Sequence, residues 1–389
     1  MTDGLIGVVN AGSSSLKFSI YAGDDCLLNG QVDGIGVRPA AKARTGAGEA
    51  LPPPDLSAAP PATPADALVA LMPWLQEWLA GRRLSAIGHR VVHGGPNHAA
   101  PARVTPAMLD ELEAFVPLAP LHQPHNLAPI RAALARNPGL PQVACFDTAF
   151  HRTIPEVAQV FALPWEMAER GIRRYGFHGL SYEYIASVLP RAAPEIAAGR
   201  VVVAHLGNGA SLCAMRAGRS MATTMGFSAL DGLPMGTRCG QLDPAVVLHL
   251  MTTEGMDAEA VEALLYRKSG MLGLSGVSSD FRDLLASEKP RARFAIEVFV
   301  HQVARNVASL AGAMGGLDGL VFTAGVGENA VAIREAVCRA CGWMGVELDE
   351  AANAARGKRI STPGSRVGVH VIPTDENLMI ARHTRALVR

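Results

Sequence analysis

VVNAGSSSLKFSIY, residues 8–21, decides the fold, because it places a Gly- and Ser-rich turn between two apolar stretches. Residues 4–22 contain a β-branched run followed by an alternating run, which predicts two strands joined by that turn. The same plan of strand, polar turn and strand recurs in VVVAHLGNGASLCAM, residues 201–215. Two copies of one supersecondary unit indicate a duplicated architecture with a cleft between the copies.

The rest of the chain alternates strand and helix patterns. Residues 84–95 and 141–151 are each predicted to form a strand that ends in polar groups or glycine, and ligands collect beyond the carboxyl ends of strands in open α/β sheets. Helices are expected to begin near Thr63 and Thr105, where a threonine precedes a proline. Residues 296–314 carry an apolar stripe that predicts a further helix.

Length and composition limit the classes of protein that this chain can be. At 389 residues it exceeds the roughly 250–300 residues at which a single core stops growing, so we expect two domains. Lys plus Arg equals Asp plus Glu, at 35 each, so no overall field favours nucleic acid or an anionic membrane, and any anion site must be local. The Pro-, Ala- and Gly-rich residues 39–65 are expected to form a surface loop.

The sequence predicts a soluble, cytoplasmic protein without a membrane or nucleic-acid partner. It begins without a basic region leading into a long apolar stretch, and no later apolar run approaches the ~20 residues of a membrane span. The six cysteines are too few for a disulfide framework in so long a chain, which fits a reducing compartment. Neither Cys338 and Cys341 nor the HQPH stretch at 122–125 has the context of a zinc site.

Three glycine-rich turns, at residues 10–15, 207–211 and 325–329, each follow a predicted strand. Such turns present backbone N–H groups to an anion, and a following helix adds the positive end of its dipole. Each turn alone is more often structural, but the three together favour a site for the several phosphates of a nucleotide. None matches the Walker pattern or the Rossmann fingerprint in its strand context, so both of those enzyme classes are disfavoured.

Two arginines and a histidine lie beside small residues and are candidates for anion binding. Arg90 in GHRVVHGG and Arg238 in MGTRCG each offer a rigid fork of donors for a carboxylate or phosphate, with an ordinary ion pair as the alternative. His178 lies between Gly176 and Gly179, which leaves space for it to donate a hydrogen bond to a ligand. A loop histidine with only structural contacts is the alternative for His178.

Two carboxylates are candidates for a metal site. Asp147 ends a predicted strand, and Glu376 follows the apolar run VGVHVI. Carboxylates and amides are the oxygen ligands that Mg²⁺ accepts, usually one or two per ion, with water and phosphate completing the shell. The fold would have to bring these carboxylates to Asn10 for such a site to form.

Nine motifs, in chain order, together closely resemble the acetate kinase family from end to end: VVNAGSSSLKFSIY, GHRVVHGG, ACFDTAFH, RRYGFHGLSYEYI, VVAHLGNGASLCA, GLPMGTRCGQLDP, SGMLGLSGVSSDFRDL, VFTAGVGENA and TDENLMIARHT. The resemblance implies an α/β fold of the duplicated actin/hexokinase/Hsp70-like ATPase type (ribonuclease H-like), with two domains and an interdomain cleft. It implies an N-terminal domain of residues 1–148 plus 377–389 and a C-terminal domain of residues 149–376. It also implies a homodimer that pairs through the C-terminal domain.

The resemblance further implies a reaction and its residues. The reaction is Mg²⁺-dependent, reversible phosphoryl transfer from ATP to acetate, giving ADP and acetyl phosphate, with Mn²⁺ as a substitute metal. The metal positions are Asn10 and Glu376. The catalytic positions are Arg90, Asp147, His178 and Arg238, and transition-state charge is stabilised by His122, His178 and Arg238. The acyl pocket consists of Arg90, Val92, Leu121, Phe177 and Pro234. The nucleotide positions are Ser13, Ser15, Lys17, His205, Leu206, Gly207, Asn208, Gly209, Asp280, Phe281, Arg282, Gly325, Val326, Gly327, Glu328 and Asn329.

Other functions remain as alternatives. A propionate kinase is the nearest, because one methylene in a pocket is typically worth only ~1–3 kcal/mol; Val92 favours the smaller acid, since a shorter side chain would leave more room. A non-catalytic nucleotide-binding regulator of the same fold is disfavoured by the presence of both arginines, His178 and Glu376. A pyrophosphate-dependent variant is disfavoured by SSDFRDL and TAGVGEN. Gln123 and Gln241 depart from the family pattern of asparagine and an acid, and both flank expected site residues.

Overall fold

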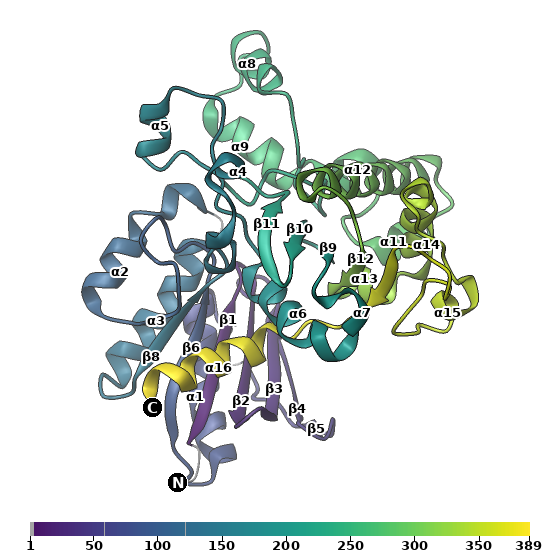
Figure 1. Ribbon diagram of the computed structural model, residues 1–389. Coiled ribbons are helices and arrows are strands. Elements are labelled where there is room, and N and C mark those ends of the chain that lie inside the picture. The colour runs from purple at the N-terminus through teal and green to yellow at the C-terminus, as the bar shows by residue number, and fades with distance from the viewer. Residues whose placement is uncertain (1–3, 58, 121) are drawn as a thin grey trace. The chain divides into compact units, whose positions relative to one another are not determined.

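The computed structural model describes residues 4–57, 59–120 and 122–389. The chain divides into two compact units, one of Met1–Phe150 with Asp375–Arg389 and the other of His151–Thr374. Each unit contains one β-sheet with helices packed on it (Figure 1). The chain returns to the first unit at Asp375, so Glu376 belongs to the same unit as Asn10.

The sheet of the first unit has the strand order β5-β4-β3-β2-β1-β6-β8-β7 among the described residues. Its strands are β1 Leu5–Ala11, β2 Ser15–Ala22, β3 Asp25–Asp33, β4 Ala40–Thr45, β5 Ala50–Leu51, β6 Leu84–Val91, β7 Ala102–Arg103 and β8 Gln142–Phe146. β1 and β2 form the antiparallel hairpin predicted from residues 4–22, and β6 and β8 continue the sheet in parallel with β1. The carboxyl ends of β1, β6 and β8 therefore meet at one edge.

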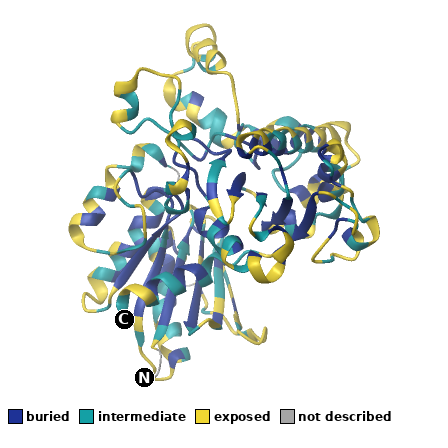
Figure 2. Ribbon diagram, in the orientation of Figure 1, coloured by how far each residue is buried: buried dark blue, intermediate teal, exposed yellow. Residues whose placement is uncertain are grey.

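Helices cover both faces of this sheet. They are α1 Pro64–Leu79, α2 Pro106–Glu113, α3 Gln123–Arg136 and α16 Glu376–Val388, with the 3₁₀ turns Val116–Leu118 and Ala149–Thr153. α1 begins where predicted, because Thr63 and Asp66 form a reciprocal capping box before Pro64. α1 and α3 pack on β1, β2 and β6, and apolar residues of β2 are buried beneath them (Figure 2). α16 packs on the other face, as a side chain at Gly88 would meet Ile380.

The sheet of the second unit has the order β11-β10-β9-β12-β13. Its strands are β9 Arg200–Leu206, β10 Ala210–Arg216, β11 Arg219–Thr223, β12 Gly319–Thr323 and β13 Gly368–Val371. Its helices are α4 Glu156–Gln159, α5 Trp165–Glu169, α6 Gly179–Ala192, α7 Pro194–Ala197, α8 Pro244–Thr252, α9 Ala258–Arg267, α10 Gly270–Ser275, α11 Phe281–Ala286, α12 Pro290–Met314, α13 Ala324–Asn329, α14 Val331–Ala340 and α15 Glu350–Ala354, with a 3₁₀ turn at Gly342–Met344. α12, which contains the predicted stripe, packs on β9, β10 and β11.

The two sheets repeat one topology, which confirms the internal duplication inferred from the sequence. In each sheet, three neighbouring strands pair antiparallel, and the first of them in the chain also pairs in parallel with the next of two further strands. The spatial order is β3-β2-β1-β6-β8 in one unit and β11-β10-β9-β12-β13 in the other. The hairpins β1–β2 and β9–β10 occupy equivalent places. The first unit adds β4, β5 and β7 at its edges.

The prediction that residues 39–65 form only a surface loop was wrong. Residues Ala40–Thr45 form β4, which pairs with β3, and Ala50–Leu51 pair with β4 in turn. Composition misled here because a strand at the edge of an existing sheet needs few apolar residues: β4 buries Ala43 and exposes its neighbours. Between β5 and α1, the described residues form no helix or strand. No helix among the described residues is long and apolar enough to cross a membrane.

Candidate functional site

In the first unit, the ion pair between the half-buried Arg90 and the buried Asp147 is the centre of a polar cluster. Arg90 lies on β6 and Asp147 directly follows β8. The Arg90 Nε donates to both carboxylate oxygens at 3.0 and 3.1 Å, and Nη2 donates to Oδ2 at 2.5 Å. Burial alone would lower the pKa of Arg90, but the charges of Asp147 and Glu376 raise it above its usual value. The guanidinium is therefore a fixed positive charge.

Asn10 and Glu376 belong to the same cluster, although 366 positions separate them. The Asn10 Nδ2 donates to Glu376 Oε2 at 3.4 Å, and Arg90 Nη1 donates to Asn10 Oδ1 at 3.4 Å. No three His, Cys, Asp or Glu side chains within the described ranges gather so as to hold a metal by themselves. The Glu376 carboxylate with the neighbouring Asn10 amide fits Mg²⁺, which takes the rest of its shell from water and phosphate. Asp147 fits less well, because Arg90 occupies both of its oxygens.

The glycine-rich turn at residues 10–15 lies beside this cluster. Lys17 on β2 is the register partner of Asn10 on β1, and paired residues project their side chains from the same face of a sheet. Ser13 is exposed in the turn, Ser15 begins β2, and Gly12 closes the turn by donating to the Ser15 carbonyl at 2.8 Å. Lys17 is exposed, so its ammonium can reach an anion near Asn10.

The turn after β6 is held by two amide side chains of α3. Asn126 accepts from the Val92 N–H at 2.9 Å and donates to the Ala11 carbonyl at 2.6 Å. Gln123 is buried, accepts from the His93 N–H at 3.1 Å and donates to the His93 carbonyl at 2.9 Å. Gln123, which departs from the family pattern, therefore holds the backbone of His93 through two hydrogen bonds. Val92 is buried, His122 precedes α3 and is half-buried, and Leu121 lies outside the described residues.

In the second unit, the first turn of α6 and the hairpin β9–β10 bring two histidines together. His178, directly before α6, stacks on His205 of β9 with ring centroids 4.2 Å apart and planes inclined by 17°. The His178 Nδ1 contacts Ser211 Oγ at 2.8 Å, and the His205 Nδ1 contacts Ser181 Oγ at 2.8 Å. Each imidazole is thus fixed by a serine of the opposite element.

Arg238 reaches the same place from another loop. Its Nη1 donates to the Ala229 carbonyl at 2.6 Å. A Cβ added at Gly209 would lie 2.8 Å from Arg238 Nη2 and 3.2 Å from His178 Nε2. The side of Gly209 left open by the missing side chain therefore faces these two nitrogen atoms, and a larger residue would have to displace the end of the Arg238 side chain. Asn208, also in the 207–209 turn, is exposed and accepts from the Gly236 N–H through its carbonyl.

The remaining predicted positions divide into exposed and structural ones. Arg282 is exposed and pairs with Asp280, which caps α11, whereas the ring of Phe281 packs edge-on against Phe299. The turn at 325–329 is helix α13, in which Gly325 and Asn329 are exposed and Gly327 is buried. Glu328 is structural, because its carboxylate accepts from the N–H groups of Ala324 and Thr374.

Three predicted positions are buried, and Gln241 points elsewhere. Phe177 and Pro234 are buried in the second unit. Leu206, the last residue of β9, is also buried. The side chain of Gln241 accepts from Arg305 of α12, so the second departure from the family pattern takes part in a surface contact.

Sequence reasoning missed the residues that hold the site residues in place: Asn126, Ser181, Tyr182 and Ser211. Ser181 and Tyr182 follow His178 by three and four positions, the spacing that places side chains on one face of a helix. That spacing in HGLSY was the available signal. Ser211 could be found only through the register that pairs it with His205.

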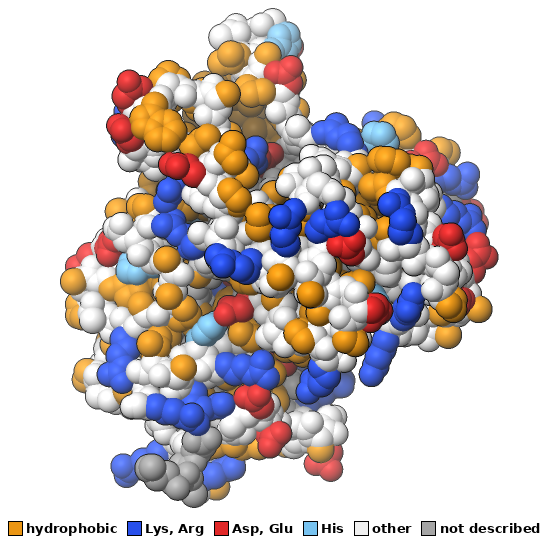
Figure 3. All heavy atoms as spheres, in the orientation of Figure 1, with side chains coloured by type: hydrophobic (Ala, Val, Ile, Leu, Met, Phe, Trp, Pro, Cys, Tyr) orange, Lys and Arg blue, Asp and Glu red, His pale blue; other side chains and the backbone are white. Residues whose placement is uncertain are grey.

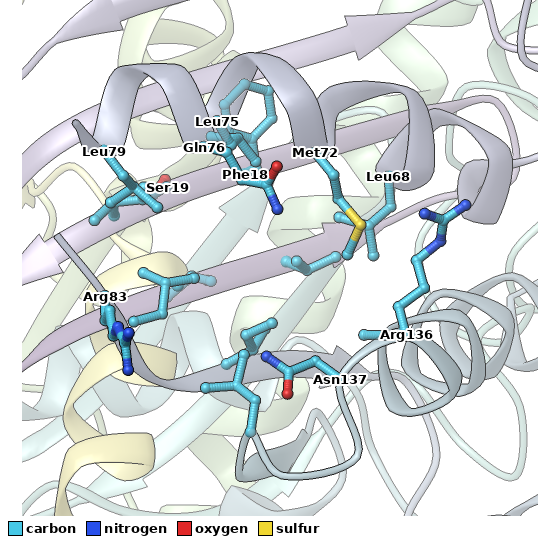
Figure 4. Close-up of a pocket in the computed structure, with 18 of the residues that line it drawn as sticks. Phe18, Ser19, Leu68, Met72, Leu75, Gln76, Leu79, Arg83, Arg136 and Asn137 are labelled. Carbon is cyan, nitrogen blue, oxygen red and sulfur yellow. The ribbon is translucent and has the colours of Figure 1, made fainter. Parts of the chain in front are cut away.

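A hollow of about 650 Å³ lies elsewhere in the first unit, beneath α1 (Figure 4). Apolar residues such as Leu68, Met72 and Leu75 line it, and Arg83 and Arg136 lie at its edges. It contains no carboxylate or histidine among its described lining residues. Its described lining therefore offers neither the carboxylate of the cluster around Arg90 nor the histidines that lie beside Gly209.

Comparison with known proteins agrees with this geometry. The model of the acetokinase family matches residues 5–382. The chain is 54% identical over 392 residues to the acetate kinase of Rhodopseudomonas palustris and 51% identical over 385 residues to that of Rhizobium meliloti, with 98% of each chain covered. It resembles the crystal structures of Porphyromonas gingivalis acetate kinase (37% identity, TM-score 0.86) and a propionate kinase from Francisella tularensis (35%, 0.91), with 99% of this chain and all of each other chain covered.

The repeated sheets, with polar groups at the ends of equivalent strands, define a kinase with the duplicated ATPase fold of the actin and hexokinase type. More narrowly, the chain belongs to the acetokinase family.

Buried histidines around the site predict how stability depends on pH. Burial lowers the pKa of His89, His93 and His151 to about 4, from 6.5. Each is neutral in the folded protein near pH 6 but becomes protonated when the chain unfolds. The unfolded state therefore binds more protons between about pH 4 and 6.5, and the free energy of unfolding falls as the pH is lowered through that window.

We expect His89→Gln to reduce this pH dependence by on the order of 2–3 kcal/mol across the window, because glutamine takes up no proton. Urea unfolding at a series of pH values measures the effect. His301→Gln, which replaces an exposed histidine, is the matched control and should leave the slope unchanged. An identical slope in wild type and His89→Gln would contradict the prediction.

Proposed function

We propose that the protein transfers the γ-phosphoryl group of ATP to acetate, giving acetyl phosphate and ADP, and catalyses the reverse reaction. The observation that carries the proposal is the convergence of Arg238 Nη2 and His178 Nε2 on the open side of Gly209. Two hydrogen-bond donors at one glycine form a site for the oxygens of a transferring phosphoryl group. The names of the relatives at 51–54% identity support acetate as the acceptor.

The chemistry requires little from the protein beyond binding and charge stabilisation. An acetate oxygen attacks the γ-phosphorus, the bond from that phosphorus to the β,γ-bridging oxygen breaks, and ADP leaves with the electron pair. A carboxylate is already a nucleophile at neutral pH, so no general base is needed. In this proposal Arg90 neutralises the acetate, and His178 and Arg238 stabilise charge on the phosphoryl oxygens.

We propose Mg²⁺ as the metal and Asn10 and Glu376 as its protein ligands. When bound, the ion would neutralise charge on the ATP phosphates. The side chains around it have separate tasks. Asp147 holds the Arg90 fork in one orientation through three hydrogen bonds. Lys17, Ser13 and the 207–209 turn bind phosphate oxygens, and Arg282 and the exposed start of α13 bind the adenosine.

Acetate is preferred over propionate in this proposal because of Val92. Val92 is buried, and Asn126 fixes its backbone. The turn therefore cannot easily move aside for a longer acyl chain. A propionate kinase remains the alternative, since a structure of that name also matches the whole chain.

Loss of an anion-binding arginine tests the kinase function. We expect Arg238→Ala to lower kcat on the order of 10²–10³-fold, as removal of one transition-state donor does elsewhere. Arg90→Ala should have a similar effect. Acyl phosphate formed from Mg-ATP and acetate is trapped with hydroxylamine and measured as the hydroxamate. Arg136→Ala, at the edge of the apolar hollow, is the matched control with wild-type turnover. Absence of hydroxamate with formate, acetate, propionate and butyrate would refute the function.

Val92→Ala tests the choice of acid. Removing two methyl groups from the pocket should raise the ratio of kcat/KM for propionate to that for acetate roughly 5- to 100-fold, the range expected for about one methylene of extra space. The hydroxamate assay with both acids measures the ratio. A wild-type ratio already in favour of propionate would establish the alternative, and an unchanged ratio in Val92→Ala would exclude Val92 from the pocket.

We also propose a homodimer that pairs through α8. This helix, PAVVLHLMT, has no buried residue, and its Val246, Leu248 and Met251 are 39%, 62% and 40% exposed. A helix that packs on one side, against α9, and exposes its apolar side chains is typical of a subunit interface. Hydrophobic side chains are exposed at the top of the surface in Figure 3, where Figure 1 places α8. A second copy of this helix is a suitable partner, because neither copy brings an Asp, Glu, Lys or Arg side chain of α8 into the interface.

Leu248→Glu should convert the dimer to a monomer, because two desolvated carboxylates would face each other across the interface. Sedimentation velocity gives the mass of the particle in solution. Val37→Glu introduces the same charge at a side chain that is 92% exposed in the first unit, and it should remain dimeric. A monomeric wild-type protein would exclude the proposed dimer.

A further inference from the structure

We propose that Tyr182 and Ser211 form a hydroxyl chain that holds His178 as the tautomer with its proton on Nε2. Both would then be positioning residues for phosphoryl transfer, acting through His178. The inference rests on the proposed function, in which His178 donates a hydrogen bond to the transferring group. It adds two residues that touch neither reactant.

Three hydrogen-bonding groups lie in series. The hydroxyl of Tyr182 is 2.5 Å from Ser211 Oγ, which is 2.8 Å from His178 Nδ1. Tyr182 and Ser211 are fully buried, so water cannot replace either hydrogen bond. The far nitrogen of the ring, Nε2, is the one that lies near Gly209 and Arg238.

The direction of hydrogen-bond donation from Tyr182 through Ser211 to His178 follows from counting donors and acceptors. Burial raises the pKa of Tyr182 well above its usual value, so its hydroxyl keeps a proton. If Tyr182 donates to Ser211, and Ser211 donates to His178 Nδ1, both hydroxyl protons have acceptors. In the opposite direction, the Tyr182 proton would have no acceptor that the structure shows among the described residues. A buried donor without a partner costs about 1–3 kcal/mol, so the first direction is preferred.

Acceptance at Nδ1 fixes the proton of a neutral imidazole on Nε2. The other nitrogen of His178 is then a hydrogen-bond donor beside Arg238, where phosphoryl oxygens require donors. In the other tautomer, Nε2 would present a lone pair to an anion. The tautomer therefore decides whether His178 attracts or repels the transferring group.

The backbone of His178 shows that its orientation is imposed by the surroundings. Its φ of 58° and ψ of 24° are in the left-handed region, which non-glycine residues rarely adopt. Such a conformation persists where surrounding contacts determine it. Ser211 holds one edge of the ring and His205 covers one face. Tyr182, one turn along α6, holds Ser211 and so fixes the ring of His178 indirectly.

The experiment compares kinetics with the protonation state of the ring. Ser211→Ala and Tyr182→Phe should each lower kcat roughly 3- to 10-fold, as loss of one hydrogen bond does, while KM for ATP and acetate stays within twofold. In the His178→Ala background, Ser211→Ala should have no further effect, because its role depends on the imidazole. Ser187→Ala and Tyr184→Phe, on the same helix, are the matched controls and should retain wild-type kcat.

Long-range ¹H–¹⁵N correlation spectra of protein labelled with ¹⁵N-histidine give the tautomer directly, with His178→Ala identifying the signal. Wild type should show a protonated Nε2 and an unprotonated Nδ1, and both variants should show a mixed population. A protonated Nδ1 in the neutral wild-type ring, unchanged kcat in both variants, or additive losses with His178→Ala would overturn the inference. If the protein transfers no phosphoryl group, the proposed function fails, and the spectra still decide the tautomer.

Discussion

The antiparallel pairing of one short hairpin in each unit is the constraint on which the site depends. In β1–β2 the register pairs Asn10 with Lys17, and in β9–β10 it pairs His205 with Ser211. A shift of one residue would turn each of these side chains to the opposite face of its sheet. The turns between the strands are short, so they fix the register and also present backbone N–H groups to an anion. The residues that fix the fold are thus also those to which we assign phosphate binding.

Charge is arranged locally on a chain whose net formal charge is zero. Figure 3 shows basic and acidic side chains interspersed over the visible surface. The groups to which we assign anion binding instead have fixed partners and are partly or fully buried. Arg90 is held by a carboxylate that is itself almost fully buried, and a charge in that setting is screened far less by salt than one at the surface. This arrangement suits an enzyme whose two reactants are both anions.

Much of the fold could be predicted from local signals. The hairpin at 4–22, its copy at 201–215, the capped start of α1 and the stripe of α12 all follow from periodicity and capping. β4 escaped prediction because its pairing depends on β3, and an Ala-rich segment shows no preference of its own. For the site, the motifs identified Asn10, Arg90, Asp147 and Glu376, but only the fold could show that they share one cluster. Ser211 escaped because its part in the site comes from strand register, which has no signature within its own motif.

The left-handed backbone of His178 sets the role proposed for this residue against the stability of the fold. A non-glycine residue in that region costs roughly 1–3 kcal/mol, a considerable share of the 5–15 kcal/mol by which a typical domain is stable. Glycine or asparagine would adopt the same backbone at lower cost. Selection for heat resistance alone would therefore favour those residues at position 178 and discard the imidazole. The role proposed for His178 in phosphoryl transfer would therefore carry a cost in folding stability at this one residue.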